Sequence, residues 1–255
     1  MILAKYFFLS ALLFYFAGIV VLFFKKLKFS VFAEYLFLSG FLFHLVSCIF
    51  CPARNVNMHQ ALSFLSLSLL LVYFLIKFIR RTSAGQPFFF ILSFLISALS
   101  VAVPTTQIEI KNFSSFFFIT HIILTIIGVG GLFSALIYSF IYNIQEERLK
   151  NKKPLFSSSI FPSLERCNTL SFKSLRDGYL VYTLGIFMGY FWSYKAKGVI
   201  TNFTLKETFA TLSWMFFSFI YFIQKNYGWR GRKVFFLYLL GIFSIFLAIA
   251  GIRIF

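Results

Sequence analysis

The sequence contains few charged residues, and very few of these are acidic. Only 12 % of the 255 residues are charged, and seven Asp and Glu residues stand against 24 Lys and Arg residues. A soluble domain carries roughly a quarter of its residues as charged side chains. This chain therefore has too little polar surface to cover a soluble globule, and we exclude that class.

The residues that build most catalytic and metal centres are equally scarce. The three His, three Cys and seven acidic residues form no cluster with metal-ligand spacing, and the chain has neither a glycine-rich phosphate loop nor a nucleophile elbow. Cys48 and Cys51 form a C-x-x-C pair without thioredoxin-like surroundings, which we interpret as structural, with thiol exchange as the alternative. No catalytic residue is predicted.

Apolar residues are abundant instead. Hydrophobic residues make up 60 % of the chain, 41 residues are Phe, and the mean hydropathy is +0.88. A net charge of +17 is also compatible with nucleic-acid binding. In so apolar a chain, the basic bias of cytoplasmic loops explains this charge more simply. We expect the lipid bilayer as partner and no nucleic acid.

The apolar residues fall into segments of the length that crosses a membrane, which needs roughly 20 residues. We predict an all-α, polytopic transmembrane helix bundle of about eight spans, forming a single domain over 1–255. The fifth span is long enough to protrude as a helix into the basic stretch after it. The segment 144–177 is then the only sizeable loop. The predicted spans are 6–24, 31–50, 60–78, 87–104, 114–142, 178–193, 208–224 and 234–254.

The basic residues predict the orientation of these spans. The loops after spans one, three, five and seven hold 17 of the 24 Lys and Arg residues, if Lys77 is counted with its loop. Because basic loops stay in the cytoplasm, both termini are predicted outside and 144–177 inside. The segment 194–206 and the start of the span 114–142 then lie on the outer face.

Two histidines fall where an imidazole has a functional interpretation. His121 opens the span 114–142 at the outer interface, where it is either solvated by headgroups or an axial ligand to haem iron. His44 lies inside the span 31–50, where polar side chains are costly and often functional, although it can equally hydrogen-bond a neighbouring helix.

Small residues predict close helix contacts. Gly131 and Ala135 lie four residues apart in the fifth span, and Gly185 and Gly189 lie four apart in the sixth. In lipid, such pairs let another helix or a flat ligand approach closely. We predict that leucine at Gly185 or Gly189 destabilises the bundle.

One stretch before the seventh span carries a recognisable order of residues. Gly198, Lys206 and Glu207 occupy the Gly, Lys and Glu positions of a loop with the pattern Trp-Gly-x-x-Trp-x-Trp-Asp-Pro-Lys-Glu. Phe203 keeps an aromatic residue of that pattern, and Trp214 follows seven residues after the acid. In these positions the chain resembles the cytochrome c assembly family of CcsA/HemX-type membrane proteins.

Further matches extend this resemblance over roughly 114–255, with the first half matched more loosely. Gln224 stands where the family has a membrane histidine. The length of the chain and the Gly-Trp-Arg-Gly turn at 228–231 point to the short HemX-like branch. The other matching positions are the Pro-x-Leu-Glu element at 162–165, Gly189, Trp192 and His121.

The resemblance implies a haem-handling assembly or accessory factor rather than an enzyme, with haem as the cofactor. The outer segment 194–206 is then expected to present an aromatic surface to the porphyrin, with His121 and His44 as candidate iron ligands and His59 as a further substitute. The other residues expected around haem are Trp192, Gly198, Phe203, Lys206, Glu207 and Trp214.

The implied location is the bacterial cytoplasmic (inner) membrane, and the implied partners are other cytochrome c assembly or haem-biosynthesis proteins. Two alternatives stay open. One is a HemX-like regulator or scaffold of haem biosynthesis that acts through the basic cytoplasmic loop. The other is a small-molecule transporter, although the sequence has no inverted repeat and no paired broken helices.

Overall fold

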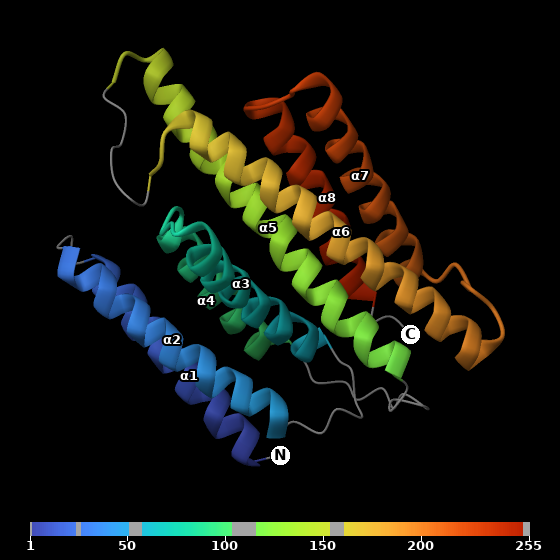
Figure 1. The fold of residues 1–255 in the computed structure, drawn as a ribbon. Helices are drawn as coiled ribbons and strands as arrows, with labels where there is room; N and C mark the ends of the chain where they lie inside the picture. Colours follow the sequence, from blue (N-terminus) through green and yellow to red (C-terminus); the bar gives the residue numbers. More distant parts are fainter. Residues whose placement is uncertain (1, 24–26, 51–57, 104–115, 154–160, 252–255) are drawn as a thin grey trace. The chain divides into compact units, whose positions relative to one another are not determined.

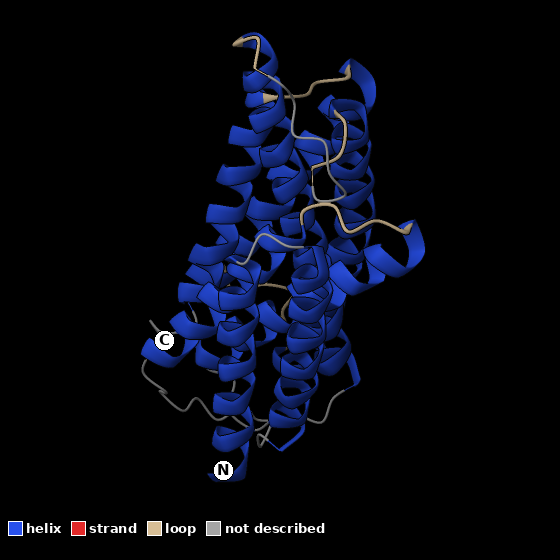
Figure 2. Cartoon of the chain, turned by 90° about the vertical axis from the view of Figure 1, so that its left-hand side faces the viewer, coloured by secondary structure: helices blue, strands red, loops and turns tan. Residues whose placement is uncertain are grey.

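The computed structural model describes residues 2–23, 27–50, 58–103, 116–153 and 161–251. These residues form helices joined by loops and contain no strand (Figure 2), which confirms the predicted all-α class. The eight helices in the described ranges are α1 (Ile2–Phe23), α2 (Leu27–Phe50), α3 (Met58–Arg80), α4 (Gln86–Ala102), α5 (Phe116–Lys150), α6 (Leu164–Lys197), α7 (Leu205–Tyr227) and α8 (Arg232–Ala250).

Length and composition identify the helices that can cross a bilayer. Among the described residues, five helices qualify: α1, α2, α3, α5 and α8. Helix α4 is apolar but has only 17 residues. Helices α6 and α7 do not meet the same criterion. The chain is therefore a multi-pass helical membrane protein, and the crossing of all eight segments stays a prediction.

The helices divide into two compact units. The N-terminal unit comprises Met1–Leu70 and Gln86–Ile110, and the C-terminal unit comprises Leu71–Gly85 and Lys111–Phe255. Helix α3 contributes to both units. The expectation of a single transmembrane domain over 1–255 stays a prediction.

Stacked rings and hydroxyl pairs fill the N-terminal unit. The rings of Tyr15 and Phe37 lie 5.2 Å apart, and those of Phe37 and Phe90 lie 3.9 Å apart. Ser66 of α3 and Ser93 of α4 are buried, with their hydroxyl oxygens 2.9 Å apart. Because lipid offers polar groups no hydrogen bonds, such pairs satisfy the hydroxyls inside the protein.

Glycines bring α5 and α6 together along the C-terminal unit, where the two helices run side by side (Figure 1). A Cβ on Gly128 would lie 2.5 Å from the backbone nitrogen of Tyr182, and one on Gly131 would lie 2.7 Å from the Cα of Gly178. A Cβ on Gly185 would likewise come too close to Thr125. The predicted small-residue positions therefore lie at the contact between these two helices.

The boundaries of α5 and α6 correct the predicted loop 144–177. Helix α5 continues to Lys150, as the predicted protrusion requires, but α6 begins at Leu164, so the loop prediction was wrong over 164–177. The hydroxyl of Ser163 accepts a hydrogen bond from the backbone N–H of Arg166 and caps the helix. Cys167, Leu170 and Leu175 are buried, so packing sustains helix in a stretch too polar to be recognised by hydropathy.

The loop predicted to lie on the outer face is also shorter than predicted. Helix α6 runs to Lys197, and α7 begins at Leu205, so the predicted loop 194–206 reduces to 198–204. Gly198 ends α6 with φ 75°, and its N–H donates to the carbonyl of Tyr194. Glycine suits this left-handed helix cap because it has no Cβ.

Four helix ends meet at one end of the C-terminal unit, which we call the loop end. It comprises the start of α5, the end of α6, the start of α7 and the end of α8 (Figure 1). The rings of Phe118 and Trp192 are 4.7 Å apart, and a Cβ on Gly251 would lie 3.1 Å from the backbone nitrogen of Lys206. Most of the predicted haem residues are on these four helix ends or on the loop between α6 and α7.

Candidate functional site at the loop end

His121 of α5 is held in one tautomer by helix α6. Its Nδ1 lies 2.7 Å from the carbonyl oxygen of Gly185. A carbonyl only accepts hydrogen bonds, so Nδ1 carries the proton and donates it. The other ring nitrogen, Nε2, then has a free lone pair, which is what a metal ligand requires.

The space around His121 is shaped by glycine and threonine. A Cβ on Gly189 would lie 2.7 Å from both Cε1 and Nδ1 of His121, so only glycine leaves room for the ring. The hydroxyl oxygen of Thr125 lies 3.3 Å from the same Nδ1. The imidazole is therefore oriented from both helices.

Trp192 lies one turn beyond Gly189 on α6. Its ring packs on Phe118, and the ammonium of Lys197 lies 5.9 Å from the Trp192 ring centroid. Its Nε1 is buried and has no hydrogen-bond partner among the described residues. An unpaired buried donor costs about 1–3 kcal/mol and is often kept for a functional role.

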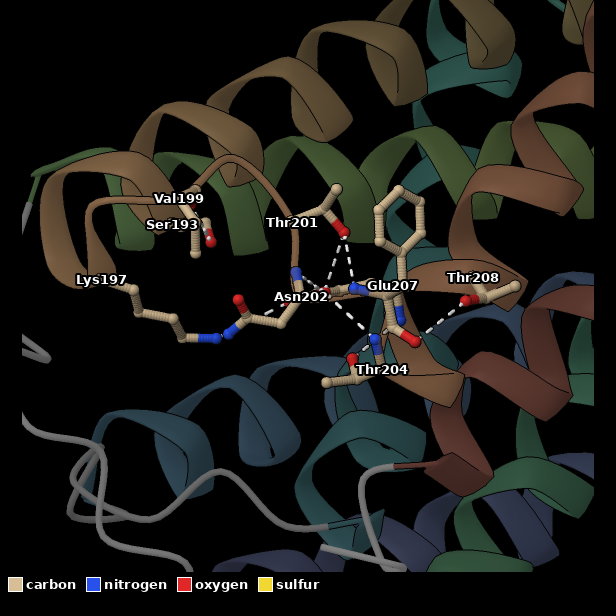
Figure 3. Close-up of polar contacts among 9 residues, drawn as sticks. Ser193, Lys197, Val199, Thr201, Asn202, Thr204, Glu207 and Thr208 are labelled. Carbon is tan, nitrogen blue, oxygen red and sulfur yellow. Dashed lines mark hydrogen bonds and ion pairs between the residues drawn. The ribbon is translucent and has the colours of Figure 1, made fainter.

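Glu207 ties the loop 198–204 to the start of α7 (Figure 3). Its Oε2 accepts hydrogen bonds from the hydroxyl of Thr201 at 3.0 Å and from the backbone N–H groups of Asn202 at 2.9 Å and Thr204 at 3.4 Å. The hydroxyl of Thr204 accepts in return from the N–H of Glu207. This capping box satisfies the free N–H groups at the helix start and fixes the loop conformation.

Phe203 projects from this fixed loop. Its side chain is 80 % exposed and its φ is 52°, a left-handed conformation that is costly for a bulky residue. The N–H of Phe203 donates to the hydroxyl of Thr201, and its carbonyl accepts from the hydroxyl of Thr208. Local hydrogen bonds thus hold an exposed aromatic ring in a strained position.

The three lysines of this end differ in their surroundings. The Nζ of Lys195 lies 4.9 Å from the centroid of the Phe117 ring, and the Nζ of Lys197 lies 3.6 Å from Oε1 of Glu207. Lys206 is exposed, and its backbone packs against Gly251. All three lysines are exposed, and among the described residues only Lys206 has neither an ion pair nor a contact with an aromatic ring.

Structural roles account for both Gly198 and Trp214. Nothing lies within 4 Å of a Cβ built on Gly198, so this glycine serves the left-handed turn. The Nε1 of Trp214 donates to the hydroxyl of Thr183 at 3.0 Å and joins α7 to α6. A role of either residue in haem contact stays a prediction.

His44 belongs to the N-terminal unit and is fully buried. Its Nδ1 lies 3.2 Å from the hydroxyl of Tyr15, and its Nε2 lies 2.6 Å from the hydroxyl of Ser63. Both nitrogens are thus within hydrogen-bond distance of side chains on neighbouring helices, which agrees with the alternative interpretation of His44. His59 differs, because its Nδ1 donates to the carbonyl of Ser100 at 2.7 Å and leaves Nε2 with a lone pair. His59 is the better second candidate for a nitrogen ligand.

The sequence did not predict the roles of several residues at the loop end. The carbonyl of Gly185 orients His121, and Thr201 and Asn202 bind Glu207, yet none of the three carries a motif that predicts this. The capping box of Thr204 was readable, because Thr precedes Glu207 by three residues at a helix start.

The Glu207 carboxylate should make the loop end sensitive to acid. Burial raises the pKa of this carboxyl, but the hydrogen bonds from Asn202, Thr201 and Thr204 and the Lys197 ammonium outweigh that effect. Its pKa therefore lies below the usual 4.5. A lowered pKa means that the ionised group stabilises the fold above the ordinary carboxyl range, and that this contribution disappears as pH falls through the lowered pKa.

We expect Glu207→Gln to lower the melting temperature at neutral pH and to converge with the wild type in acid. The measurement is thermal unfolding in detergent across pH, with Glu165→Gln as the control at a helix start without this network. A wild-type advantage that persists unchanged into acid would contradict the proposed role of the carboxylate.

These observations define the class as a multi-pass helical membrane protein with an oriented histidine and an aromatic loop at one end of its C-terminal unit. The family model described as "Cytochrome C assembly protein" matches residues 55–255. The chain therefore belongs to the cytochrome c assembly family.

Curated relatives carry the name cytochrome c biogenesis protein CcsA. One from Prochlorococcus marinus (strain MIT 9301) is 35 % identical over 89 residues, which cover 34 % of this chain and 29 % of the relative. Another, from Heterosigma akashiwo (strain NIES-293 / 8280G21-1), is 22 % identical over 233 residues, covering 77 % of this chain and 72 % of the relative. The similarity to the first relative thus spans less than a third of its length. No solved structure matches the chain.

Proposed function

We propose that this protein handles haem for cytochrome c assembly and presents it at the loop end of the C-terminal unit. The observation that carries the proposal is the hydrogen bond from Nδ1 of His121 to the carbonyl of Gly185, which leaves Nε2 free. Imidazole nitrogen is the usual protein ligand of haem iron. A backbone carbonyl on the opposite nitrogen fixes the ring and raises the basicity of the ligand.

The other groups at the loop end fit the same ligand. Val199, Ile200 and Phe203 are exposed apolar side chains on the loop, and they provide surface for a flat aromatic molecule. Lys206 supplies a positive charge for a propionate. Trp192 adds an indole N–H that lacks a partner among the described residues.

When bound, haem would supply an iron that accepts a nitrogen ligand, and His121 is the residue that would provide it. In this proposal His121 holds the iron from α5, while Gly189 keeps the ring unobstructed. Glu207 keeps the loop in place, and the apolar loop side chains exclude water. No residue is assigned a catalytic step, and the role is that of an assembly or accessory factor.

The absorption spectrum of the purified protein tests this proposal. Protein from haem-replete cells should show a Soret band. Lys206→Ala should weaken haem retention without lowering the yield of protein, whereas Lys225→Ala, a lysine at the far end of α7, should retain haem fully. A protein that is colourless and also fails to bind added haem would refute the proposal.

The proposed orientation places the loop end outside the cytoplasmic membrane of a bacterium, with both termini outside. Its support is the distribution of basic residues, 17 of 24 of which belong to alternate loops. An impermeant thiol reagent should therefore label a cysteine placed after Phe255 and should not label one at Lys152, in intact cells of a cysteine-free background. Labelling at Lys152 with protection after Phe255 would invert the topology.

One observation favours a second candidate, a HemX-like regulator or scaffold of haem biosynthesis. Helices α5 and α6 continue beyond the predicted spans on the side predicted to be cytoplasmic, and their extensions over 143–150 and 164–177 carry five of the seven Lys and Arg residues between 143 and 177. This basic surface suits an acidic protein partner. The test is to replace the basic residues of these extensions with neutral ones. A variant that still binds haem normally but has lost its function would favour the scaffold role.

A further inference from the structure

A hollow of about 730 Å³ lies at the C-terminal end of α3, in the C-terminal unit. Its lining combines three chemical types: the apolar Phe74, Phe78 and Ile79, the basic Lys77 and Arg81, and the hydroxyl-bearing Thr82 and Ser83. The volume is within the range of small-molecule sites. Arg80, next to the hollow, pairs with Asp177 of α6, far from the end of that helix at Lys197, so the hollow is separate from the loop end.

An ion pair shows where the hollow lies along the length of the helices. A guanidinium nitrogen of Arg80 lies 2.7 Å from Oδ2 of Asp177, and its other terminal nitrogen lies 3.3 Å from the hydroxyl of Ser174. These contacts join the end of the predicted span 60–78 to the start of the predicted span 178–193. The hollow thus lies at the level where the predicted spans end, which the prediction places at the membrane–water interface. About 30 Å of helix separates Asp177 from the loop end of α6.

The side chains around the hollow match the two halves of a phospholipid. Phe78 is 84 % exposed and Ile79 is 71 % exposed, and both are next to the basic residues. Apolar rings suit acyl chains, and cations with hydroxyl groups suit a phosphate. Arg176 also pairs with Asp177 at 2.9 Å, so this carboxylate is shared between Arg80 and Arg176.

Arg81 is the residue that ordinary helix chemistry does not explain. Lys77 and Arg80 occupy the last turn of α3, where cations offset the helix dipole. Arg81 lies beyond that turn at φ 46°, a left-handed position at which glycine is the least costly residue. The chain therefore holds a cation at the hollow in a strained backbone conformation, which is typical of ligand sites.

We propose that this hollow binds the phosphate of an anionic phospholipid from the surrounding bilayer. Arg81 and Lys77 contact the phosphate, with Thr82 and Ser83 as hydrogen-bond donors, while Phe78 and Ile79 pack on the acyl chains. The bound lipid anchors the end of α3 at the interface. This proposal does not depend on haem binding.

The test is native mass spectrometry of the full chain in mild detergent, with added phosphatidylglycerol or phosphatidylcholine. The wild type should retain phosphatidylglycerol in preference to phosphatidylcholine. Arg81→Gly removes the cation and relieves the left-handed strain, so it should lower phosphatidylglycerol binding about fivefold without lowering the melting temperature. Arg81→Lys should retain most of the binding, and Lys225→Gln should bind as the wild type does.

Four outcomes would overturn the proposal. The first is equal binding of the two lipids, and the second is equal phosphatidylglycerol binding by Arg81→Gly and Lys225→Gln. The third is complete displacement of the lipid by inorganic phosphate at millimolar concentration, which would identify the hollow as a free phosphate site. An Arg81→Gly variant that binds less lipid but also has a lower melting temperature than the wild type would likewise count against the site.

Discussion

Leucine at Gly128 should destabilise the C-terminal unit more than leucine at Gly189 or Gly198. A Cβ at this position would lie 2.5 Å and 2.6 Å from the backbone nitrogen and Cα of Tyr182. A flexible side chain can move away, but helix α6 must shift as a whole. Overpacking costs about 1–3 kcal/mol, and contact with backbone places this variant at about 3 kcal/mol.

Thermal unfolding in detergent measures this effect, and Gly198→Leu is the matched control. Nothing lies within 4 Å of a Cβ on Gly198, so the same side chain there adds only the strain of a left-handed residue, about 1–2 kcal/mol. Gly189→Leu, whose Cβ would meet the side chain of His121, should fall between the two. Equal melting temperatures for Gly128→Leu and the wild type would show that α5 and α6 do not pack as described.

Alanine at His121 should abolish haem retention if the proposed function is correct. Free imidazole should restore it, because the small molecule can occupy the space of the lost ring beside Gly189. The protein itself should accumulate normally, since the lost hydrogen bond to Gly185 contributes only about 1 kcal/mol. The measurement is the Soret absorbance per protein, with and without imidazole.

His44→Ala is the informative comparison for this experiment. His44 is buried and engaged at both nitrogens, so its loss should lower stability through unpaired Tyr15 and Ser63 hydroxyls while the Soret band persists in the folded fraction. Retention of the band in His121→Ala without imidazole would remove His121 from the site.

Hydropathy alone predicted the eight helical segments, because apolar runs of this length are rare outside membrane-spanning helices. It was wrong over 164–177, where Cys167 and Leu170 are buried by packing although the segment is polar overall. A hydropathy value is an average over a window of residues, so it does not detect a helix that buries only one of its faces. The same limit explains why the predicted sixth span ended before helix α6 does.

The candidate site was predictable only in part. Glu207 at a helix start and the threonine three residues before it form a pattern that local rules describe. The tautomer of His121 depends on a carbonyl 64 residues away in the sequence, on another helix. Ranking His59 above His44 likewise needed the hydrogen bonds of both rings. Such contacts follow from helix packing, which spacing along the chain does not encode.

The most direct test of the central claim is the magnetic coupling between bound ferric haem and histidine nitrogen in ¹⁵N-histidine-labelled protein. The account predicts a coupled nitrogen in the wild type that disappears in His121→Ala and persists in His44→Ala. Coupling that survives in His121→Ala, or that disappears in a folded His44→Ala protein, would contradict the assignment of His121 as the iron ligand.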